Sequence, residues 1–433
     1  MYRGEGVMKV LVIGSGGREH ALAYTLARDA QVFGAPGNPG IAQCGTCVDL
    51  STLQDTIEFC KHHAIDLVVV GPEQPLIDGL ADDLRKAGIT VFGPSAAAAR
   101  LEGSKAFMKE VCAEADVPTA SYQVYDRHQD ARNALKSAAY PVVIKADGLA
   151  AGKGVFICQN LAEAHAVVED CMVHKVFGAS GSRVVIETFL QGQEVSVFAL
   201  LDGTGQVLAL PSAQDHKRVG DGDTGLNTGG MGAYSPVPLM TPALTEQVIE
   251  TIIRPIDQTL RTRGCPYCGV LFAGLMITSE GPVVLEFNIR FGDPEAQVIL
   301  PRLQTNMPQL LLACAQGRLA QIPPPVITSA SQVCVIMASR GYPGSYEKGQ
   351  VIAGIEEAQG LDGITVFHAG TRAQGAQLVN HGGRVLAISA QGSDVHAARD
   401  RAYEAIGLID WPEGFYRCDI GWQYELSQEK NAS

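Results

Sequence analysis

Short apolar runs alternate with helical patterns in the N-terminal part of the chain, and this alternation constrains the fold more than any other feature. The expected strands are Lys9–Ile13, Val32–Ala35, Leu67–Val70 and Thr90–Phe92, and the expected helices between them are Glu19–Arg28, Thr52–His62 and Pro75–Ala87. Strands that alternate with helices form a parallel sheet covered by helices on both faces. Right-handed crossovers bring the C-terminal ends of the strands to one edge, where ligands bind. The sequence therefore predicts an α/β domain with a ligand site at that edge.

The first strand runs into a glycine-rich turn, "VIGSGGREHAL". Gly14 and Gly16 fit the dinucleotide fingerprint G-x-G-x-x-G, but Glu19 stands at its third glycine. The acidic residue that would hold a ribose hydroxyl after the second strand is also missing, which argues against a nicotinamide dinucleotide. Gly14, Gly16 and Gly17 at a helix N-terminus can still hold a phosphate. The alternative is a tight strand–helix turn without a ligand.

A second glycine-rich stretch, "VVIKADGLAAGKGVFI", resembles a P-loop but does not match one. Three residues, not four, separate Gly148 from Gly152, and Gly154 follows Lys153 where a hydroxyl would hold Mg²⁺. The β-branched runs on both sides predict a hairpin. A flexible tip with a lysine suggests a flap that closes over phosphates, and the alternative is a glycine-rich surface turn.

The segment "VVLEFNIRFGDPEAQ" is the most informative of the chain. Strand alternation places Glu286, Asn288 and Arg290 on one face. Two oxygen ligands beside a cation suit a hard metal ion and an anion, and Mg²⁺ favours such a sparse protein set completed by phosphates and water. The alternative is a surface strand with mixed charges, which the apolar neighbours Val284, Leu285, Phe287 and Ile289 disfavour.

Two carboxylates, Glu187 and Glu194, flank the apolar linker "TFLQG". An apolar linker with exposed backbone suits an adenine, and a carboxylate suits ribose hydroxyls, although a solvated turn is the default interpretation. The polar segment from Gln214 to Pro236 is expected to be one long loop, and such a loop in a compact domain is functional or disordered.

Charge and composition exclude several classes of function. The net charge is −13, from 46 acidic and 33 basic residues, which argues against nucleic acid or an acidic membrane as the main partner. No apolar run approaches the ~20 residues of a membrane span. The N-terminus lacks a signal-peptide core, so we expect a cytoplasmic protein in which residues 1–7 are a ragged extension.

The eleven cysteines are expected to be reduced thiols. Two C-x-x-C pairs occur, Cys44/Cys47 and Cys265/Cys268, and the second resembles a glutaredoxin active site. That motif needs an electropositive helix N-terminus, whereas an apolar strand-like run follows Cys268. The pairs lie too far apart for a compact zinc site, and we assign them no role.

The rest of the chain changes character from about residue 140. Ser104 is a plausible N-cap for the helix "KAFMKEVCAEA". Further helices are expected at Leu161–Val173, Thr245–Arg263, Pro308–Gln316 and Val395–Ile406, and further strands at Val270–Ile277, Val283–Phe287, Gln332–Ala338 and Arg384–Ser389. The segment "IPPPVITS" reads as a linker to a small third domain.

Taken in order, these segments resemble the phosphoribosylamine–glycine ligases, or glycinamide ribonucleotide synthetases, which are ATP-grasp enzymes of purine biosynthesis. The segments that carry the resemblance are "VLVIGSGGREHALA", "VVGPEQPL", "LEGSKAFMK", "VVIKADGLAAGKGV", "QDHKRVGDGDTGLNTGGMGAYSP", "LEFNIRFGDPEAQ", "VFHAGT" and "NHGGRVL". The resemblance runs from Met8 to about Trp422.

The resemblance implies an α/β and α+β multidomain protein. Its parts would be a Rossmann-like pre-ATP-grasp domain, an ATP-grasp lid subdomain, an ATP-grasp catalytic subdomain and a small C-terminal β-rich domain, at residues 8–110, 111–195, 196–328 and 329–427. Residues Gly148–Gly154 would then be the loop that closes over the ATP phosphates.

The implied reaction joins glycine to 5-phosphoribosylamine, with ATP giving ADP and phosphate through a glycyl phosphate. Phosphoryl transfer needs neutralised charge and in-line positioning more than a protein nucleophile. The resemblance implies ATP and Mg²⁺ or Mn²⁺ as cofactors, and a monomer or weak homodimer that binds neither nucleic acid nor membrane.

The implied site residues fall into four groups. Arg290 and Lys153 would act on the transferred group. The residues implied for ATP are Lys105, Lys145, Lys153, Glu187, Phe189, Leu190 and Glu194, and those for the metal are Glu286 and Asn288. The residues implied for the other substrates are Gly14, Gly16, Gly17, Arg18, Asn38, Glu73, Asp215, Lys217 and Asp293.

One departure and two alternatives accompany this interpretation. Many ATP-grasp enzymes carry a second metal-binding carboxylate on the preceding strand, but here that strand reads "GVLFAGLMI" and has no acid. One alternative is a redox or nucleotide-sensing protein that binds a dinucleotide and exchanges thiols, which would explain neither "EFNIRFGDPE" nor the lysines. The other is a different ATP-grasp carboxylate–amine ligase of the same pathway.

Overall fold

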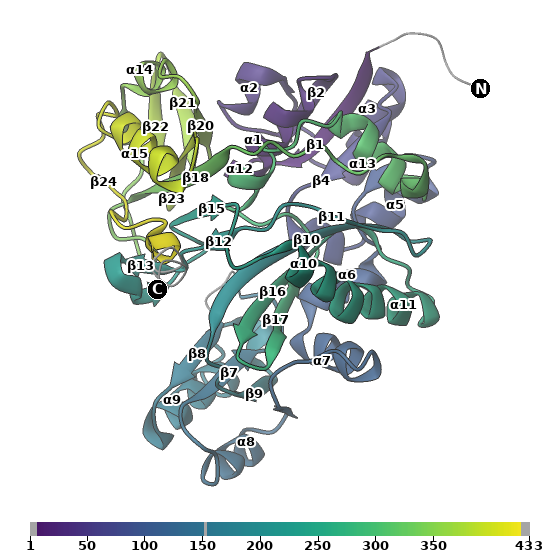
Figure 1. Cartoon of the computed structure of the whole chain (residues 1–433), viewed down its shortest axis with the longest axis vertical. Coiled ribbons are helices and arrows are strands. Elements are labelled where there is room, and N and C mark those ends of the chain that lie inside the picture. Colours follow the sequence, from purple (N-terminus) through teal and green to yellow (C-terminus); the bar gives the residue numbers. More distant parts are fainter. Residues whose placement is uncertain (1–6, 151–153, 426–433) are drawn as a thin grey trace.

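The computed structural model describes residues 7–150 and 154–425 and begins with a five-stranded parallel sheet (Figure 1). The strand order is β3-β2-β1-β4-β5, with bounds β1 (Met8–Gly14), β2 (Ala30–Pro36), β3 (Thr46–Cys47), β4 (Leu67–Val70) and β5 (Val91–Phe92). All pairings in this sheet are parallel. The predicted parallel sheet is confirmed, because buried β-branched strands alternate with helices that cross between them.

The helices of this sheet are α1 (Gly17–Leu26), α2 (Ile41–Cys44), α3 (Leu53–His63), α4 (Glu73–Ile77) and α5 (Leu80–Lys86). The single helix predicted at Pro75–Ala87 is wrong, because the structure has two helices there. Gly79 lies between them with φ of 92°, a left-handed conformation that a helix interior does not accept.

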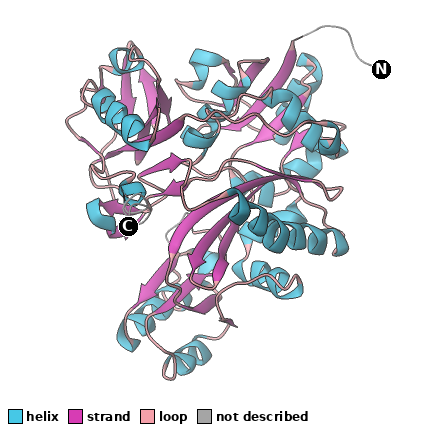
Figure 2. Cartoon of the chain, viewed as in Figure 1, coloured by secondary structure: helices cyan, strands magenta, loops and turns pink. Residues whose placement is uncertain are grey.

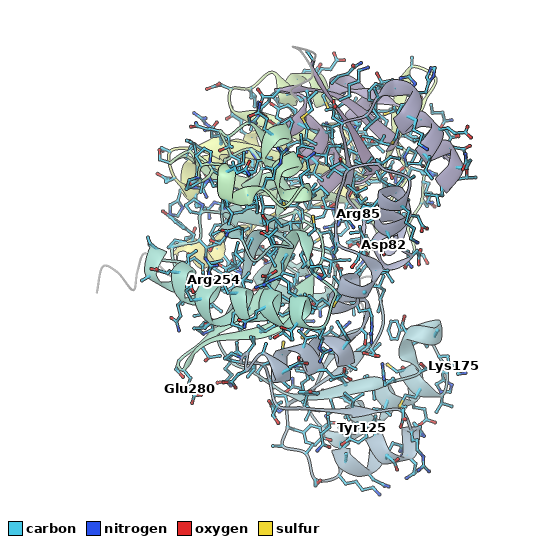
Figure 3. All side chains as sticks on the ribbon, turned by 90° about the vertical axis from the view of Figure 1, so that its right-hand side faces the viewer. Asp82, Arg85, Tyr125, Lys175, Arg254 and Glu280 are labelled. Carbon is cyan, nitrogen blue, oxygen red and sulfur yellow. The ribbon has the colours of Figure 1, made fainter. Side chains whose placement is uncertain are left out.

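Helices α6 (Ala96–Gly103) and α7 (Lys105–Glu114) lead to a separate lower lobe. The Ser104 hydroxyl accepts a hydrogen bond from Phe107 N at 3.1 Å and caps α7, as predicted. The lobe contains an antiparallel sheet in the order β6-β9-β7-β8 and two helices, with bounds β6 (Tyr122–Tyr125), β7 (Val142–Ala146), β8 (Val155–Cys158), β9 (Val184–Thr188), α8 (His128–Leu135) and α9 (Leu161–Met172). Figure 3 shows Tyr125 and Lys175 on this lobe, away from Asp82 and Arg85.

The predicted hairpin of the second glycine-rich stretch is confirmed, because β7 and β8 pair antiparallel from Val142↔Cys158 to Lys145↔Val155. Residues 151–153, which include the predicted site residue Lys153, lie outside the described part of the chain. Lys145 of β7 lies at the root of the hairpin. Its side chain donates a hydrogen bond to Leu285 O of β17 (Gly281–Asn288).

An antiparallel sheet runs through the middle of the molecule toward the lower lobe (Figure 2). Its order is β11-β10-β16-β17, with bounds β10 (Gln193–Asp202), β11 (Val207–Ala209), β16 (Cys268–Thr278) and β17 (Gly281–Asn288). The predicted helix at Thr245–Arg263 is present as α10 (Pro242–Val248), a π-helical turn and α11 (Arg254–Thr262). This sheet carries the segment that the sequence marks as most informative.

The prediction of one continuous loop over Gln214–Pro236 is wrong. The segment contains β12 (Gln214–Asp215), β13 (Arg218–Gly220), β14 (Thr224–Asn227) and β15 (Gly232–Ser235). All four residues of β15 are buried, and β15 pairs with β18 (Ser331–Ser339) of the C-terminal region. Buried backbone needs hydrogen-bond partners, and here a strand distant in sequence supplies them.

The C-terminal region completes a six-stranded sheet in which β12, β15, β18, β23 and β20 are neighbours and β24 pairs with β18. The remaining bounds are β20 (Ile364–His368), β23 (Arg384–Gly392), β24 (Gly414–Phe415), α12 (Ala296–Ile299), α13 (Met307–Ala315) and α15 (Val395–Ile406), while β19 (Val351–Ile352), β21 (Thr371–Gln374) and β22 (Gln377–Asn380) form a small separate sheet. The predicted strands at Gln332–Ala338 and Arg384–Ser389 and the helix at Val395–Ile406 are confirmed.

Aromatic side chains join the N-terminal sheet to the central sheet. Phe92 of β5 and Phe198 of β10 each stack with Phe291, at ring-centroid distances of 6.4 Å. Phe198 also contacts Phe272 of β16 at 4.6 Å. Because Phe291 lies within the informative segment, just after β17, this packing holds that segment against the ligand edge of the N-terminal sheet. None of the helices in the described ranges has the length and apolarity that a membrane span needs.

Candidate active site

The end of β17 supplies the centre of the site. Phe287 is buried at 2% exposure, whereas the Glu286 side chain is 34% exposed, as alternation along a strand requires. Arg290 Nη2 donates to Asn288 Oδ1 at 3.2 Å, so these two side chains lie on one face, as predicted. The strand therefore presents a carboxylate, an amide and a guanidinium together at the junction of the central and N-terminal sheets.

Two carboxylates from the N-terminal region fix the Arg290 guanidinium. Its Nε donates to Glu73 Oε2 at 3.2 Å, and its Nη2 donates to Glu102 Oε1 at 2.9 Å. Glu73 begins α4 and Glu102 lies near the end of α6. Burial alone would raise the pKa of Glu73, but Arg290 and Arg18 lower it below its ordinary value. Arg290 is thus held in one orientation before any ligand arrives.

Glu102 was not predicted from the sequence. Both of its carboxylate oxygens accept hydrogen bonds, because Oε2 accepts from Ile289 N at 2.8 Å while Oε1 accepts from Arg290. Burial raises the pKa of Glu102 above its ordinary value, although Arg290 opposes the shift. The only signal in the sequence is its place in "LEGSKAFMK", and nothing local shows that it reaches a strand almost two hundred residues later.

Lysines surround Glu286. Lys217 follows β12 in the chain. Its Nζ lies 2.9 Å from Glu194 Oε2 and 3.9 Å from Glu286 Oε1. Burial alone would raise the pKa of Glu286, but Lys217, Lys145 and Lys105 lower it below its ordinary value. The carboxylate therefore stays ionised at neutral pH, which a metal ligand must do.

Glu286 and Asn288 fit a magnesium-type ion better than a softer metal. Within the described ranges, no group of three or more His, Cys, Asp or Glu side chains could hold a metal by itself. Two hard oxygen donors with room for phosphates and water suit Mg²⁺, which keeps much of its coordination outside the protein. The strand β16 beside them carries no acid, so these two donors would hold the ion without a second protein carboxylate there.

A buried chain of charges holds Lys145. Its Nζ donates to Leu285 O at 2.9 Å and lies 3.0 Å from Glu187 Oε2. The other oxygen of Glu187 lies 3.2 Å from Nζ of Lys109, which is completely buried. The Glu187 carboxylate therefore points into the protein and binds two lysines rather than facing a ligand. Phe189 and Leu190 follow β9 and are half-buried.

Lys109 was also missed, because from the sequence it is one more lysine on a helix. Its Nζ donates to Thr119 Oγ1 at 2.6 Å, and burial lowers its pKa below the ordinary value despite Glu187. Lys109 pairs with the Glu187 carboxylate, which also pairs with Lys145, so Lys109 helps to hold Lys145 in place.

Asp147 ties the root of the β7–β8 hairpin to the start of α7. Its carboxylate accepts from Ala106 N at 2.7 Å, from Ser104 Oγ at 3.2 Å and from Arg183 Nε at 2.8 Å. Lys105 Nζ lies 3.5 Å from Gly148 O at the same place. Burial lowers the pKa of Lys105, and Glu286 opposes the shift. Lys105 and Lys145, both at the hairpin root, thus act together on the charge of Glu286.

Glu19 and Asn38 fix the conformation of the first glycine-rich turn. Gly14 has φ of 125°, and a Cβ there would lie 2.5 Å from Glu19 Cγ. Glu19 Oε2 accepts from Gly16 N at 2.6 Å. The Asn38 amide donates to Ser15 O and His368 O, both at 2.8 Å, and its Oδ1 accepts two backbone N–H groups. Asn38 therefore positions the turn and has no amide hydrogen left for a ligand.

Arg18, from the start of α1, lies between this turn and β17. Its Nη1 donates to Phe291 O at 3.3 Å, and its backbone N donates to Asp293 Oδ2 at 3.2 Å. A Cβ at Gly17 would lie 2.6 Å from Gln297 Nε2, so Gly17 is needed for close packing. The predicted phosphate turn and the β17 segment are thus in direct contact.

The C-terminal sheet contributes Arg384, which the sequence interpretation did not single out. Its Nη1 donates to Asp293 O at 2.6 Å and to Gly229 O at 2.7 Å. Burial alone would raise the pKa of Asp293, but Arg384 and Arg18 lower it. Asp215, at the end of β12, lies near Arg384 and Lys217. The site therefore draws on the N-terminal, central and C-terminal sheets and on the root of the β7–β8 hairpin.

The arrangement suits transfer of a phosphoryl group. Several cations converge on one ionised carboxylate, and an amide and a fixed guanidinium stand next to it. Such a set neutralises and aligns phosphates without providing a covalent nucleophile, as phosphoryl transfer requires.

Comparison with family models gives matches over most of the chain. The phosphoribosylglycinamide synthetase N domain matches residues 8–102, the ATP-grasp (A) domain matches residues 103–296, and the C domain matches residues 332–423. The junctions between these matches fall close to Ser104 and to the linker before β18.

Individual proteins are similar over the whole chain. The phosphoribosylamine–glycine ligase of Rhizobium meliloti (strain 1021) is 52% identical over 421 residues, covering 96% of this chain and 98% of the relative. The crystal structure of phosphoribosylamine–glycine ligase from Thermotoga maritima has a TM-score of 0.85 at 32% identity and covers 96% of this chain and 100% of that chain. The biotin carboxylase domain of Hydrogenobacter thermophilus 2-oxoglutarate carboxylase has a TM-score of 0.73 at 17% identity, covers 95% of this chain and 92% of that chain, and shows a shared fold alone. The chain therefore belongs to the phosphoribosylamine–glycine ligase family.

Proposed function

We propose that this protein joins glycine to 5-phosphoribosylamine and converts ATP to ADP and phosphate. The observation that carries the proposal is the set of Glu286, Asn288 and Arg290 at the end of β17, with Lys105, Lys145 and Lys217 around Glu286. Family membership supports the choice of substrates. A dinucleotide-dependent redox protein would leave these three residues and the lysines around them without a role.

The reaction has two steps. A carboxylate oxygen of glycine attacks the γ-phosphorus of ATP, the bond to the β-phosphate bridging oxygen breaks, and ADP leaves. The amine of phosphoribosylamine then attacks the carbonyl carbon of glycyl phosphate, loses a proton, and displaces phosphate. Arg290 holds the glycine carboxylate or the transferring phosphoryl group in line, and its fixed orientation lowers the cost of reorganisation.

The lysines hold ATP in this proposal. Lys105 and Lys145 neutralise its phosphates, and Lys153, outside the described residues, adds a charge from the flap. The segment from Glu187 to Leu190 holds adenine through its backbone and apolar side chains, while the Glu187 carboxylate keeps Lys145 in place. Glu194 takes the ribose, for which it must leave Lys217.

Glu286 and Asn288 hold Mg²⁺ or Mn²⁺, and the ion when bound neutralises charge that develops on the phosphates. Phosphoribosylamine lies at the ligand edge of the N-terminal sheet, along Gly14, Gly16, Gly17 and Arg18. Asn38 and Glu73 position this edge, and Asp293, which Arg384 of the C-terminal sheet contacts, and Lys217 complete the substrate site.

We also propose the cytoplasm as the compartment and a monomer or weak homodimer as the assembly. All eleven cysteines are free thiols, as expected in a reducing compartment. We also propose domain limits at residues 110, 195 and 328. Strands β12 and β15 lie before the last of these limits in sequence, but they pair within the sheet of the C-terminal region.

The direct test is ADP release with purified protein, ATP and Mg²⁺. Multiple-turnover release should require both glycine and phosphoribosylamine, because glycine forms the acyl phosphate and the amine of phosphoribosylamine consumes it. Equal turnover with aminoimidazole ribonucleotide and bicarbonate in their place would show a different ATP-grasp ligase. NADPH binding together with reactive thiols, and no ADP release, would favour the redox alternative.

Glu286→Gln should lower turnover at least roughly tenfold and raise the Mg²⁺ concentration needed for half-maximal rate, because an amide is a weaker ligand than a carboxylate. Titration of activity with Mg²⁺ measures both effects. Glu280→Gln, in the exposed turn before β17, is the matched control and should behave as the parent. An unchanged Mg²⁺ requirement in folded Glu286→Gln would refute the assignment of this ligand.

Glu102→Gln should lower kcat/KM for glycine by roughly 10–100-fold, because Arg290 loses one of two charge-assisted contacts that orient it. The KM for ATP should change little, since Lys105 and Lys145 keep their partners. Steady-state kinetics with each substrate varied separate the two effects. Glu110→Gln, exposed on α7, is the control. Equal losses for both substrates would mean that Glu102 supports the fold only.

A further inference from the structure

Arg417 is an almost completely buried arginine of the C-terminal region, and the proposed mechanism gives it no role. Its side chain is 1% exposed and lies shortly after β24 in the chain. The guanidinium Nε and Nη2 donate to the two oxygens of Asp419 at 2.7 Å each, and Nη1 donates to Asp223 Oδ1 at 2.7 Å. Two carboxylates compensate the buried charge. The two-pronged contact with Asp419 is a geometry that a lysine cannot reproduce.

A further contact of Arg417 reaches the backbone next to an active-site lysine. Its Nη1 also donates to Arg218 O at 3.1 Å, and Arg218 directly follows Lys217 in the chain. On the other side of Lys217, the His216 ring accepts a hydrogen bond at Nε2 from Gly421 N at 3.0 Å. The C-terminal segment, Arg417–Gly421, therefore holds both chain neighbours of Lys217.

The protonation of His216 fits its contact with the C-terminal segment. Its Nδ1 lies 3.2 Å from Gly232 O, and a carbonyl oxygen can only accept, so the ring proton sits on Nδ1 and Nε2 is the acceptor. Burial and the charge of Arg417 lower the pKa of His216 to about 4. The ring is therefore neutral near pH 7 and keeps the lone pair that the Gly421 amide needs.

Backbone contacts join the C-terminal segment to the β13–β14 hairpin in both directions. Cys418 N donates to Asp221 Oδ1 at 2.8 Å, and Gly222 N donates to Asp419 Oδ2 at 2.8 Å. Strands β13 and β14 form a two-stranded sheet of their own. Because an isolated two-stranded hairpin is only marginally stable, its position depends on these contacts with the C-terminal segment.

Helix α15 and strand β15 fix the C-terminal segment in turn. The Tyr403 hydroxyl donates to Arg417 O at 2.8 Å and accepts from Ile420 N at 3.1 Å. A Cβ at Gly232 would lie 2.8 Å from Ile420 Cδ1, so β15 packs closely against the segment. A continuous series of contacts thus runs from α15 through the segment to the backbone at Lys217.

Lys217 depends on its backbone for its place in the site. Its side chain is 36% exposed, and Nζ lies 2.9 Å from Glu194 Oε2 and 3.9 Å from Glu286 Oε1. A long, partly exposed lysine side chain has many rotamers, so two exposed carboxylates alone hold it weakly. A fixed backbone limits the positions that Nζ can reach.

Resting on the proposed function, we propose that Arg417 is a positioning residue that acts through Lys217. By fixing the Arg218 carbonyl, it keeps the lysine ammonium beside Glu194 and Glu286. Arg417 itself touches neither substrate nor metal. Its loss should therefore move Lys217 without removing any group that binds a ligand.

A double-mutant cycle tests this proposal with the full-length parent, Arg417→Met, Lys217→Met and the double variant. Arg417→Met should lower kcat/KM for Mg²⁺–ATP roughly 10–100-fold, because a shift of about 1 Å in a positioned group costs up to that much. Lys217→Met should lower it at least as far. The double variant should fall within about threefold of Lys217→Met alone, because Arg417 has nothing left to position. Independent losses would multiply instead.

Matched variants keep the test decisive. Arg340 is an exposed arginine of the same region that pairs with Glu413, and Arg340→Met should match the parent. Arg417→Lys should not restore activity, because an ammonium cannot make the two-pronged contact. If Arg417→Met does not fold, Asp223→Asn replaces it in the cycle. It removes one charged partner of Arg417 and should lower kcat/KM roughly three- to tenfold in the parent but not in Lys217→Met.

Crystal structures of the parent and of Arg417→Met, or of Asp223→Asn, give a readout that does not depend on activity. In the variant, Lys217 Nζ should leave its 2.9 Å contact with Glu194. Multiplicative losses in the cycle, or an unchanged contact in a folded variant, would overturn this inference and leave the ligase activity intact. A parent that releases no ADP with glycine and phosphoribosylamine would instead refute the proposed function, and the structures would still decide whether Arg417 positions Lys217.

Discussion

The ion pairs of Arg290 with Glu73 and Glu102 determine how the parts of this molecule form one site. Arg290 lies two residues after β17 of the central sheet, and the two carboxylates belong to helices of the N-terminal region. Buried charges are unfavourable unless each has a partner, so loss of either carboxylate would leave Arg290 poorly compensated. The stacking of Phe291 with Phe92 and Phe198 places the two regions close enough for these pairs to form.

Most charged groups of the site are already bound to one another. Lys145 contacts Glu187, Lys217 contacts Glu194, and Arg384 holds the backbone at Asp293. These contacts fix the positions of the cations in the absence of substrate, which is the preorganisation that electrostatic catalysis needs. Lys217 differs from Lys145, because its carboxylate partners are half exposed, whereas Glu187 and Lys109 beneath Lys145 are buried.

The sequence predicts the local parts of this architecture well. Alternation along Val283–Phe287 anticipates a strand with Asn288 and Arg290 on one face, and the β-branched flanks of the flap anticipate the β7–β8 hairpin. These features depend on neighbours in sequence, and local periodicity records them.

The parts that the sequence did not predict depend on distant partners. Glu102 and Lys109 look like ordinary helix residues until the fold places them beside Arg290 and Glu187. The segment Gln214–Pro236 looks like a polar loop because the strand that pairs with β15 lies about a hundred residues later. Side-chain use is equally hidden: Asn38 and Glu187 carry the right groups for ligands, yet the protein itself occupies them.

The central claim of this account is that glycine is activated as an acyl phosphate on the face that bears Glu286, Asn288 and Arg290. Glycine labelled with ¹⁸O in both carboxylate oxygens tests it most directly, with mass analysis of the phosphate and the amide product after turnover. The account predicts that one labelled oxygen of each glycine appears in the released phosphate and the other stays in the amide. Released phosphate free of label, with ADP formed at the same rate, would contradict it.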